Sequence, residues 1–484
     1  MNNPSPHTTL LHRRRTKIVA TVGPASRDPA MLQALLHAGV NVFRLNLSHG
    51  DHAGHRANFE AIRTVSATAG EAVAVLADLC GPKIRVGRFA GGSIPLEKGQ
   101  AVTVTTRNVL GEPGLIPSQY AALAEDVRCG DRILLDDGML ELHVDSVAGS
   151  DIACRVTAGG VLKDRKGMNL PGVLVSSPAL TDKDCDDARF AIELGVDFLA
   201  LSFVRRPSDV ANLKSLIAAA GADTPVIAKI EKPEALDAID EILDAADGLM
   251  VARGDLGVEL APEAVPIVQH DLIERARHCH KPIIVATQML ESMIEHPRPT
   301  RAEVSDVSHA VFAGADAVML SAETASGAYP IKAVEMMDRV ARQVEGWQWI
   351  EGAFRSLTAG ERERPAPLPL REAVARSTAQ LSRDLQVRAV VVRTVHGDSA
   401  EVVAATRPAA PIIALTKDPR VFRRMNLLWG VIPRLIDAAE FECPQVSARR
   451  HACELNLAEE GQTILLLAGF GAGEPMITVL PVGN

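Results

Sequence analysis

The stretch VIAKIEKPEALDAIDEILDAADGLMVARGDLGVEL, from Val226 to Leu260, decides the fold of this chain. It holds two short apolar runs, which are separated by a helical pattern and have no hairpin turn between them. A strand–helix–strand unit of this kind makes its two strands parallel, so both strands end at the same edge of a sheet. The first run carries Lys229 and Glu231, and the second run is followed by Asp255.

These three charged residues are predicted to meet at that edge. Lys229 and Glu231 are two positions apart and therefore point to the same face of a strand. Together with Asp255 they place one ammonium and two carboxylates side by side, an arrangement that suits Mg²⁺ and leaves room for a substrate phosphate. The alternative is a surface salt bridge. The position of the charges in or beside apolar runs argues against that alternative.

The overall composition excludes several classes of protein. The chain has 484 residues, enough for two to four domains, and a net charge of −9. This charge argues against a nucleic-acid or membrane-surface partner, since such proteins carry basic stripes. No run of 18 apolar residues occurs, and the N-terminus is too polar for a signal peptide. The seven scattered cysteines indicate a reducing cytoplasm.

Eight apolar runs, alternating with helical patterns, predict a (β/α)₈ barrel formed by residues 16–84 and 181–357. The active sites of such barrels lie at the C-terminal ends of the strands. The predicted strands are Thr16–Gly23, Val40–Ser48, Ala72–Leu79, Val196–Val204, Pro225–Glu231, Gly248–Asp255, Pro282–Gln288 and Ala317–Glu323. The predicted helices are Asp28–Ala38, Asp184–Leu194, Ser208–Ala220, Glu234–Ala245 and Val265–His278.

Three other segments flank or interrupt this barrel. Residues 1–15, which end in the run Arg13–Arg15, are interpreted as a solvated lead-in. Short apolar runs between Gly, Asp and Ser predict a small all-β lid domain at residues 85–180, inserted after the third strand. After a Pro-rich linker (Thr358–Leu370), five more apolar runs predict an open α/β domain with a largely parallel sheet at residues 358–484.

Three polar features leave alternatives open. Arg44, Asn46 and Ser48 share one face of a strand. This face is either a solvated strand edge or points into the barrel. Inward polar groups without partners would cost about 1–3 kcal/mol each, so in the second case the three residues are expected to bind a ligand. Lys166, in the lid, is either a solubilising charge or a phosphate contact. The loop His396–Ala400 either holds a phosphate at a helix N-terminus or is an ordinary connection.

The chain resembles the pyruvate kinase family over almost its whole length. Eight motifs carry the resemblance, in the family's order: TKIVATVGPAS (Thr16–Ser26), FRLNLSHG (Phe43–Gly50), KGMNLPG (Lys166–Gly172), AKIEKPE (Ala228–Glu234), MVARGDLGVE (Met250–Glu259), ATQMLESM (Ala286–Met293), HPRPTRAEVSDV (His296–Val307) and MLSAETASG (Met319–Gly327). The resemblance implies a barrel with an inserted β lid and a C-terminal α/β domain. This is the same architecture that the apolar runs predict.

The implied reaction is phosphoryl transfer from phosphoenolpyruvate to ADP, which gives pyruvate and ATP. By motif position, Glu231 and Asp255 resemble the ligands of Mg²⁺ (or Mn²⁺), and Lys229 resembles the group that stabilises the migrating phosphoryl. The resemblance also implies roles for Arg44 (substrate phosphate), Gly254, Asp255 and Thr287 (substrate carboxylate), Asn46, His49, Arg85 and Lys166 (nucleotide) and Thr287 and Ser321 (protonation of the enolate).

One departure concerns K⁺, which many members of the family require. Asn46, Ser48 and Asp78 match three of the K⁺ ligands, but Leu79 replaces a threonine, and Lys83 stands where glutamate is frequent. An ammonium can take the place of a monovalent cation by Coulomb attraction. We therefore expect activity without added K⁺.

Regulation and assembly follow from the resemblance alone. The C-terminal domain is expected to bind a phosphorylated effector, AMP or a sugar monophosphate, with Thr394 and Ser399 as candidate contacts, and the protein is expected to be a homotetramer. Two rival functions stay open. One is a related barrel enzyme that cleaves or forms C–C bonds through a Mg²⁺ enolate, and the other is a binding protein with a decayed site.

Overall fold

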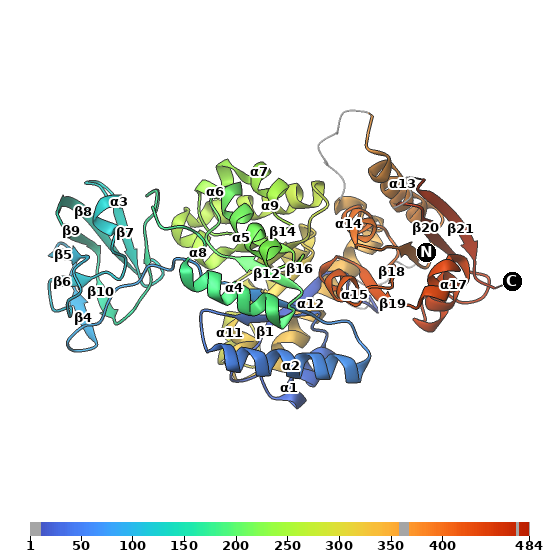
Figure 1. Cartoon of the computed structure of the whole chain (residues 1–484), viewed down its shortest axis with the longest axis horizontal. Coiled ribbons are helices and arrows are strands. Elements are labelled where there is room, and N and C mark those ends of the chain that lie inside the picture. Colours follow the sequence, from blue (N-terminus) through green and yellow to red (C-terminus); the bar gives the residue numbers. More distant parts are fainter. Residues whose placement is uncertain (1–10, 358–366, 471–473, 484) are drawn as a thin grey trace.

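The structure, a computed structural model, describes residues 11–357, 367–470 and 474–483. Residues 358–366 of the predicted linker lie outside the described residues. Figure 1 shows three parts in a row: an all-β domain at one end, a barrel in the middle and an α/β domain at the other end. The predicted fold class is confirmed, and the predicted domain boundaries stay predictions.

The central part is a closed barrel of eight parallel strands in the order β1-β16-β15-β14-β13-β12-β3-β2. All eight predicted strands are present. Their bounds are β1 Lys17–Thr21, β2 Val42–Asn46, β3 Ala74–Asp78, β12 Phe198–Leu201, β13 Val226–Ile230, β14 Gly248–Ala252, β15 Ile283–Ala286 and β16 Ala317–Leu320. The strands are buried on both faces, which is why they read as continuous apolar runs in the sequence.

Helices cover the outside of the barrel. They are α1 Pro29–Ala38, α2 His52–Ala69, α4 Asp182–Leu194, α5 Pro207–Ala219, α6 Glu234–Asp237, α7 Ile239–Ala245, α8 Arg253–Glu259, α9 Val265–His278, α10 Arg301–Phe312, α11 Ala322–Ala325 and α12 Pro330–Gly352. The single helix predicted at Glu234–Ala245 is two helices, because the backbone leaves the helical region at Ala238. The described helices include none with the length and apolar character needed to cross a lipid bilayer.

The insertion between β3 and α4 is all-β apart from one short helix. Its elements are β4 Ser93–Leu96, β5 Ala101–Thr105, β6 Leu115–Pro117, α3 Leu123–Asp126, β7 Arg132–Leu135, β8 Leu140–Ala148, β9 Asp151–Ala158, β10 Gly160–Lys163 and β11 Met168–Asn169. A six-stranded sheet, β11-β7-β8-β9-β5-β6, and a two-stranded sheet, β10-β4, enclose an apolar core of their own. This domain, called the lid below, is joined to the barrel at both of its ends.

The C-terminal part is an open α/β domain, as predicted. Its elements are α13 Leu370–Asp384, β17 Val390–Arg393, α14 Asp398–Ala405, β18 Ile412–Thr416, α15 Pro419–Arg424, β19 Val431–Leu435, α16 Ala438–Glu442, α17 Pro444–Glu454, β20 Thr463–Ala468 and β21 Met476–Pro481. Four strands of the sheet β19-β18-β17-β20-β21 are parallel, and β21 is antiparallel at the edge.

This C-terminal domain closes the N-terminal end of the barrel. Leu427 is fully buried in the apolar cluster that fills the barrel interior. Arg407 reaches across to Asp316, which directly precedes β16, with an Nη1–Oδ1 distance of 3.1 Å. Asn426 donates from its side-chain amide to the carbonyl of Asn41 at 3.0 Å, just before β2. Solvent access to the barrel is therefore confined to its C-terminal end.

The prediction that Arg13–Arg15 forms a solvated lead-in is wrong for Arg14 and Arg15, whereas Arg13 is exposed. Arg15 is 94% buried, and its backbone N–H donates to Glu345 of α12 at 2.7 Å. Arg14 forms an ion pair with Asp338, also on α12, at 3.0 Å. The local run of three arginines suggested exposure, but its acidic partners lie more than three hundred positions away in the sequence.

Candidate active site

Four charged side chains meet inside the open, C-terminal end of the barrel. Lys229 Nζ lies 3.0 Å from Glu231 Oε1 and 3.2 Å from Asp78 Oδ1. Arg44 Nε donates to Asp78 Oδ2 at 2.7 Å. None of the four residues is more than 9% exposed. The alternation of side chains along β2, β3 and β13 aims them at one another, which rules out an ordinary surface salt bridge for Lys229 and Glu231.

Burial and charge act against each other in this cluster. Burial alone would lower the pKa of Lys229, but the carboxylates of Asp78 and Glu231 outweigh it, and the pKa is raised. Burial would raise the pKa of Asp78, but Lys229 and Arg44 lower it below its usual value. At neutral pH the cluster therefore keeps a positively charged ammonium next to an ionised Asp78.

Two residues that the sequence analysis missed hold this cluster in place. Ser202 accepts a hydrogen bond from Lys229 Nζ at 2.6 Å and donates its hydroxyl to the carbonyl of Leu79 at 2.8 Å. The backbone N–H of Phe203 donates to Glu231 Oε2 at 2.8 Å. Both residues follow β12 directly. The only signal in the sequence was a serine at the end of an apolar run, and that signal is weak.

Asp255 and Gly254 lie in the first turn of α8, directly after β14. The N–H of Gly254 donates to Thr287 Oγ1 at 2.7 Å, and the Thr287 hydroxyl donates to the carbonyl of Ala286 at 2.6 Å. The groups predicted to hold a substrate carboxylate are thus adjacent, but in this structure they bind each other. Thr287 has a φ of 69°, a conformation that non-glycine residues adopt rarely and at some cost.

Arg253, another residue that sequence reasoning missed, fixes this strained turn. It is 93% buried, its Nη2 donates to the carbonyl of Thr287 at 2.6 Å, and its Nη1 forms an ion pair with Asp306 of α10 at 2.5 Å.

Ser321 directly follows the next strand, β16, as Thr287 follows β15, and its N–H donates to Glu323 Oε2 at 2.7 Å. The two hydroxyl candidates therefore follow neighbouring strands.

The carboxylates of Glu231 and Asp255 fit a Mg²⁺ ion. Burial raises the pKa of Glu231; Lys229 opposes the rise, and Asp255 adds to it, so the two carboxylates are close enough to repel each other. Mg²⁺ is commonly bound through one or two carboxylates, with water and phosphate oxygens as its other ligands. Within the described residues no group of three or more His, Cys, Asp or Glu residues could hold a metal. An ion here would depend on substrate and water for its remaining ligands.

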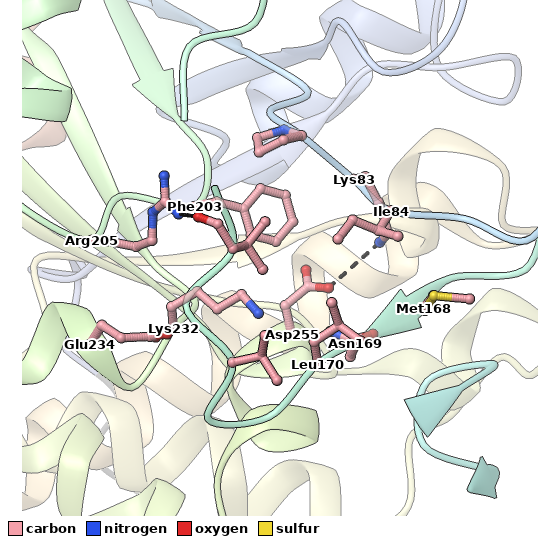
Figure 2. A pocket seen from close by; sticks show the side chains of 13 residues that line it. Lys83, Ile84, Met168, Asn169, Leu170, Phe203, Arg205, Lys232, Glu234 and Asp255 are labelled. Atoms are coloured by element: carbon pink, nitrogen blue, oxygen red, sulfur yellow. Dashed lines mark hydrogen bonds and ion pairs between the residues drawn. The ribbon is translucent and has the colours of Figure 1, made fainter. Parts of the chain in front are cut away.

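Lys83, which was predicted to replace the monovalent cation, forms an ion pair with Asp255. Lys83 Nζ lies 3.5 Å from Asp255 Oδ1, so its ion pair is with a predicted Mg²⁺ ligand rather than with Asp78. Asn46 Oδ1 accepts the N–H of Ser48 at 3.2 Å. Figure 2 shows Lys83 and Asp255 pointing toward each other in the lining of one cavity, to which the lid residues Met168 and Asn169 also contribute. The ammonium therefore adds positive charge beside a carboxylate that is predicted to bind Mg²⁺.

The predicted nucleotide contacts lie on the lid side of the mouth. Lys166 Nζ pairs with Asp136 of the lid at 2.7 Å, and Arg85 Nη1 donates to the carbonyl of Arg165 at 3.1 Å. Both side chains are partly exposed, and His49, after β2, is exposed. In this structure Lys166 and Arg85 contact other lid residues.

Comparisons with known proteins agree with this fold. The models for "Pyruvate kinase, barrel domain" and "Pyruvate kinase, alpha/beta domain" match residues 13–334 and 372–479. The chain is 45% identical to the pyruvate kinase of Staphylococcus saprophyticus over 465 residues, covering 95% of this chain and 78% of that protein. It is 44% identical to the pyruvate kinase of Mycobacterium intracellulare, covering 95% and 96%. A crystal structure of a pyruvate kinase from Cryptosporidium parvum superposes with a TM-score of 0.91 at 35% identity, covering 97% and 96%.

Proposed function

The chain belongs to the pyruvate kinase family and is a phosphotransferase, and we propose that its barrel mouth transfers a phosphoryl group from phosphoenolpyruvate to ADP. The observation that carries the proposal is the ammonium of Lys229, which is buried and kept charged by Glu231 and Asp78. A migrating phosphoryl group spreads negative charge over its oxygens, and a fixed cation in a water-poor site stabilises that charge.

We assign the other residues of the mouth by their geometry. Glu231 and Asp255 would hold Mg²⁺, which neutralises phosphate charge when bound. Arg44 is aimed into the same space and carries a planar guanidinium that suits phosphate oxygens. A substrate carboxylate would displace Thr287 from the N–H of Gly254 and gain both donors, which orients the substrate for transfer.

Proton transfer and nucleotide binding complete the proposal. After the phosphoryl group leaves, the enolate needs a proton, and the hydroxyls of Thr287 and Ser321 are our candidates for its route. Arg85 and Lys166 would bind the phosphates of ADP once the lid turns toward the barrel, and closure would exclude water from the transfer. Asn46 and His49 would border the same nucleotide.

An assay of pyruvate formation from phosphoenolpyruvate, with and without ADP, tests the reaction. We expect pyruvate only when ADP is present, with ATP formed in equal amount. Turnover that does not depend on ADP would support the C–C lyase alternative. A complete lack of turnover with either mixture would support a binding protein with a decayed site.

We also propose that the enzyme does not require K⁺, because Lys83 brings an ammonium to within 3.5 Å of Asp255. The proposal predicts full activity in a buffer that contains tetramethylammonium as its only monovalent cation. Activity below a few per cent of the value with K⁺ would contradict it.

The C-terminal domain is proposed to bind AMP or a sugar monophosphate. A cavity lined by His396, Lys417 and Arg420 lies beside the loop before α14, and Thr394 Oγ1 accepts the N–H of Gly397 in that loop at 2.9 Å. Lysine, arginine and a helix N-terminus suit a phosphate. Titration of AMP and glucose 6-phosphate at sub-saturating phosphoenolpyruvate tests this idea, and no response to either would remove it.

We further propose a cytoplasmic homotetramer without nucleic-acid or membrane partners. The seven cysteines, all within the described residues, form no disulfide bond with one another, which is consistent with a reducing compartment. Light scattering after size-exclusion chromatography measures the oligomeric state, and a monomeric mass at micromolar concentration would contradict the tetramer.

A further inference from the structure

Behind the mouth, a buried junction joins three segments of the chain. Lys232 Nζ forms an ion pair with Glu259 Oε1 at 2.5 Å, and the side-chain amide of Asn169 donates to the same oxygen at 3.1 Å. The Lys232 and Glu259 side chains are 11% and 1% exposed. Lys232 follows β13, Glu259 ends α8, and Asn169 belongs to the lid strand β11.

The two ends of this ion pair are close in sequence to the two carboxylates of the proposed metal site. Lys232 is the residue after Glu231, and Glu259 lies four positions after Asp255, one turn further along α8. The pair therefore links the two segments that must stay at a fixed separation for both carboxylates to reach one ion. Figure 2 shows the Lys232 side chain extending toward Asp255 and Asn169.

Stability alone does not account for a pair in this position. Burying a lysine and a glutamate together costs about as much in lost hydration as the attraction returns, and an apolar pair of the same size is often at least as stable. The junction is also not fully satisfied, because Glu259 Oε2 is buried and makes no hydrogen bond. What an ion pair supplies better than an apolar contact is a defined distance between two backbone segments.

The lid is connected to the same junction. Asn169 lies where the lid chain returns to the barrel, and its side chain binds Glu259. Further along this return segment, the carbonyl of Ser177 accepts a hydrogen bond from Arg205 Nη2 at 2.7 Å. The return segment is thus held at one point next to the proposed metal carboxylates and at a second point on the loop after β12. The first of these points joins the lid chain directly to Glu259.

We propose that Lys232 and Glu259 are positioning residues that set the separation of Glu231 and Asp255 and so preorganise the Mg²⁺ site. The inference rests on the proposed function, in which Glu231 and Asp255 hold the ion. Residues that orient metal ligands without touching the metal typically change metal affinity by about 10–100-fold when they are replaced.

The test measures Mn²⁺ binding to the full-length protein without substrates, from the loss of the free-ion EPR signal. We expect Lys232→Met and Glu259→Gln to weaken binding about 10–100-fold and Lys232→Arg to restore it to within about threefold of wild type. At saturating metal, the kcat of these variants should largely recover, since the proposed function assigns neither residue a contact with the substrate. Hydrogen exchange in the return segment 170–177 should become faster in Glu259→Gln.

Two further variants separate the inference from the proposal beneath it. Lys214→Met removes a lysine that pairs with Asp247 at the opposite end of the barrel, and its Mn²⁺ affinity should stay that of wild type. Glu231→Gln should abolish tight binding. If Glu231→Gln binds Mn²⁺ poorly while Lys232→Met and Glu259→Gln bind it like wild type, the positioning role is wrong and the metal site stands. Normal binding by Glu231→Gln would overturn the metal site itself. If Lys232→Met fails to fold, the isosteric Glu259→Gln decides alone.

Discussion

Lys229→Met keeps the length of the side chain at the centre of the mouth and removes its charge. Loss of one fixed donor to a transition-state charge typically lowers kcat by about 10²–10³, or about 3–4 kcal/mol. Breaking a buried ion pair costs about 3–5 kcal/mol of stability. We expect the lower end of that range, because Arg44 still neutralises Asp78 and the N–H of Phe203 still binds Glu231.

The stability of this variant should depend on pH in a defined direction. In the wild type, burial raises the pKa of Glu231 and Lys229 opposes that rise, so the variant should hold the Glu231 proton to a higher pH. An acid whose pKa is raised on folding binds more protons in the folded state, so its contribution to stability falls as pH rises. The stability deficit relative to wild type should therefore be larger at pH 8 than at pH 5.

Urea unfolding at the two pH values and a coupled assay of pyruvate formation measure these effects. Lys214→Met is the matched control, because Lys214 and Asp247 form a pair with 39% exposure on each side, and such pairs contribute about 0–1 kcal/mol. The control should have normal kcat. Turnover of Lys229→Met within about threefold of wild type would refute the assigned role, and a deficit that is equal at both pH values would refute the account of Glu231.

Three shorter predictions test other parts of the molecule. Lys83→Gln should lose activity in buffer free of K⁺ and recover part of it when K⁺ is added, as measured by the coupled assay; an unchanged variant would contradict the role of the Lys83–Asp255 pair. Thr287→Val leaves the N–H of Gly254 without its acceptor, and we expect unfolding free energy to fall by about 1–3 kcal/mol and kcat to fall with it; wild-type values of both would contradict the prediction. Burial, with a smaller contribution from Arg14, lowers the pKa of Lys17 to about 7. The unfolded chain then binds more protons between pH 7 and 10, so stability should rise over that interval, and Lys17→Met should reduce the rise seen in urea unfolding.

The sequence was sufficient to predict the eight barrel strands and the contact between Lys229 and Glu231. Parallel strands buried on both faces produce long apolar runs. A charged residue inside such a run is therefore expected at the end of the barrel, where its side chain can pair with another charge. These features depend on spacing within about thirty residues, which is the range over which periodicity carries information.

Contacts that depend on long-range docking could not be predicted. The residues next to Arg15 in the sequence suggest a solvated side chain. Only the packing of α12 against this segment shows that Glu345 binds the backbone N–H of Arg15. The pairing of Gly254 with Thr287 likewise depends on the register of two strands that the sequence does not specify atom by atom.

The closed end of the barrel shows how these long-range contacts bear on function. The interior of the barrel is packed with apolar side chains, so water cannot cross it to reach the charged cluster and screen Lys229 from the opposite side. Leu427, which lies more than a hundred positions after the last barrel strand, fills the opposite end. Because the interior between Leu427 and Lys229 is apolar, the charges face water only at the mouth beneath the lid. The C-terminal domain therefore affects the chemistry of the mouth without contacting it, which is why a substitution such as Leu427→Ala should weaken both stability and turnover.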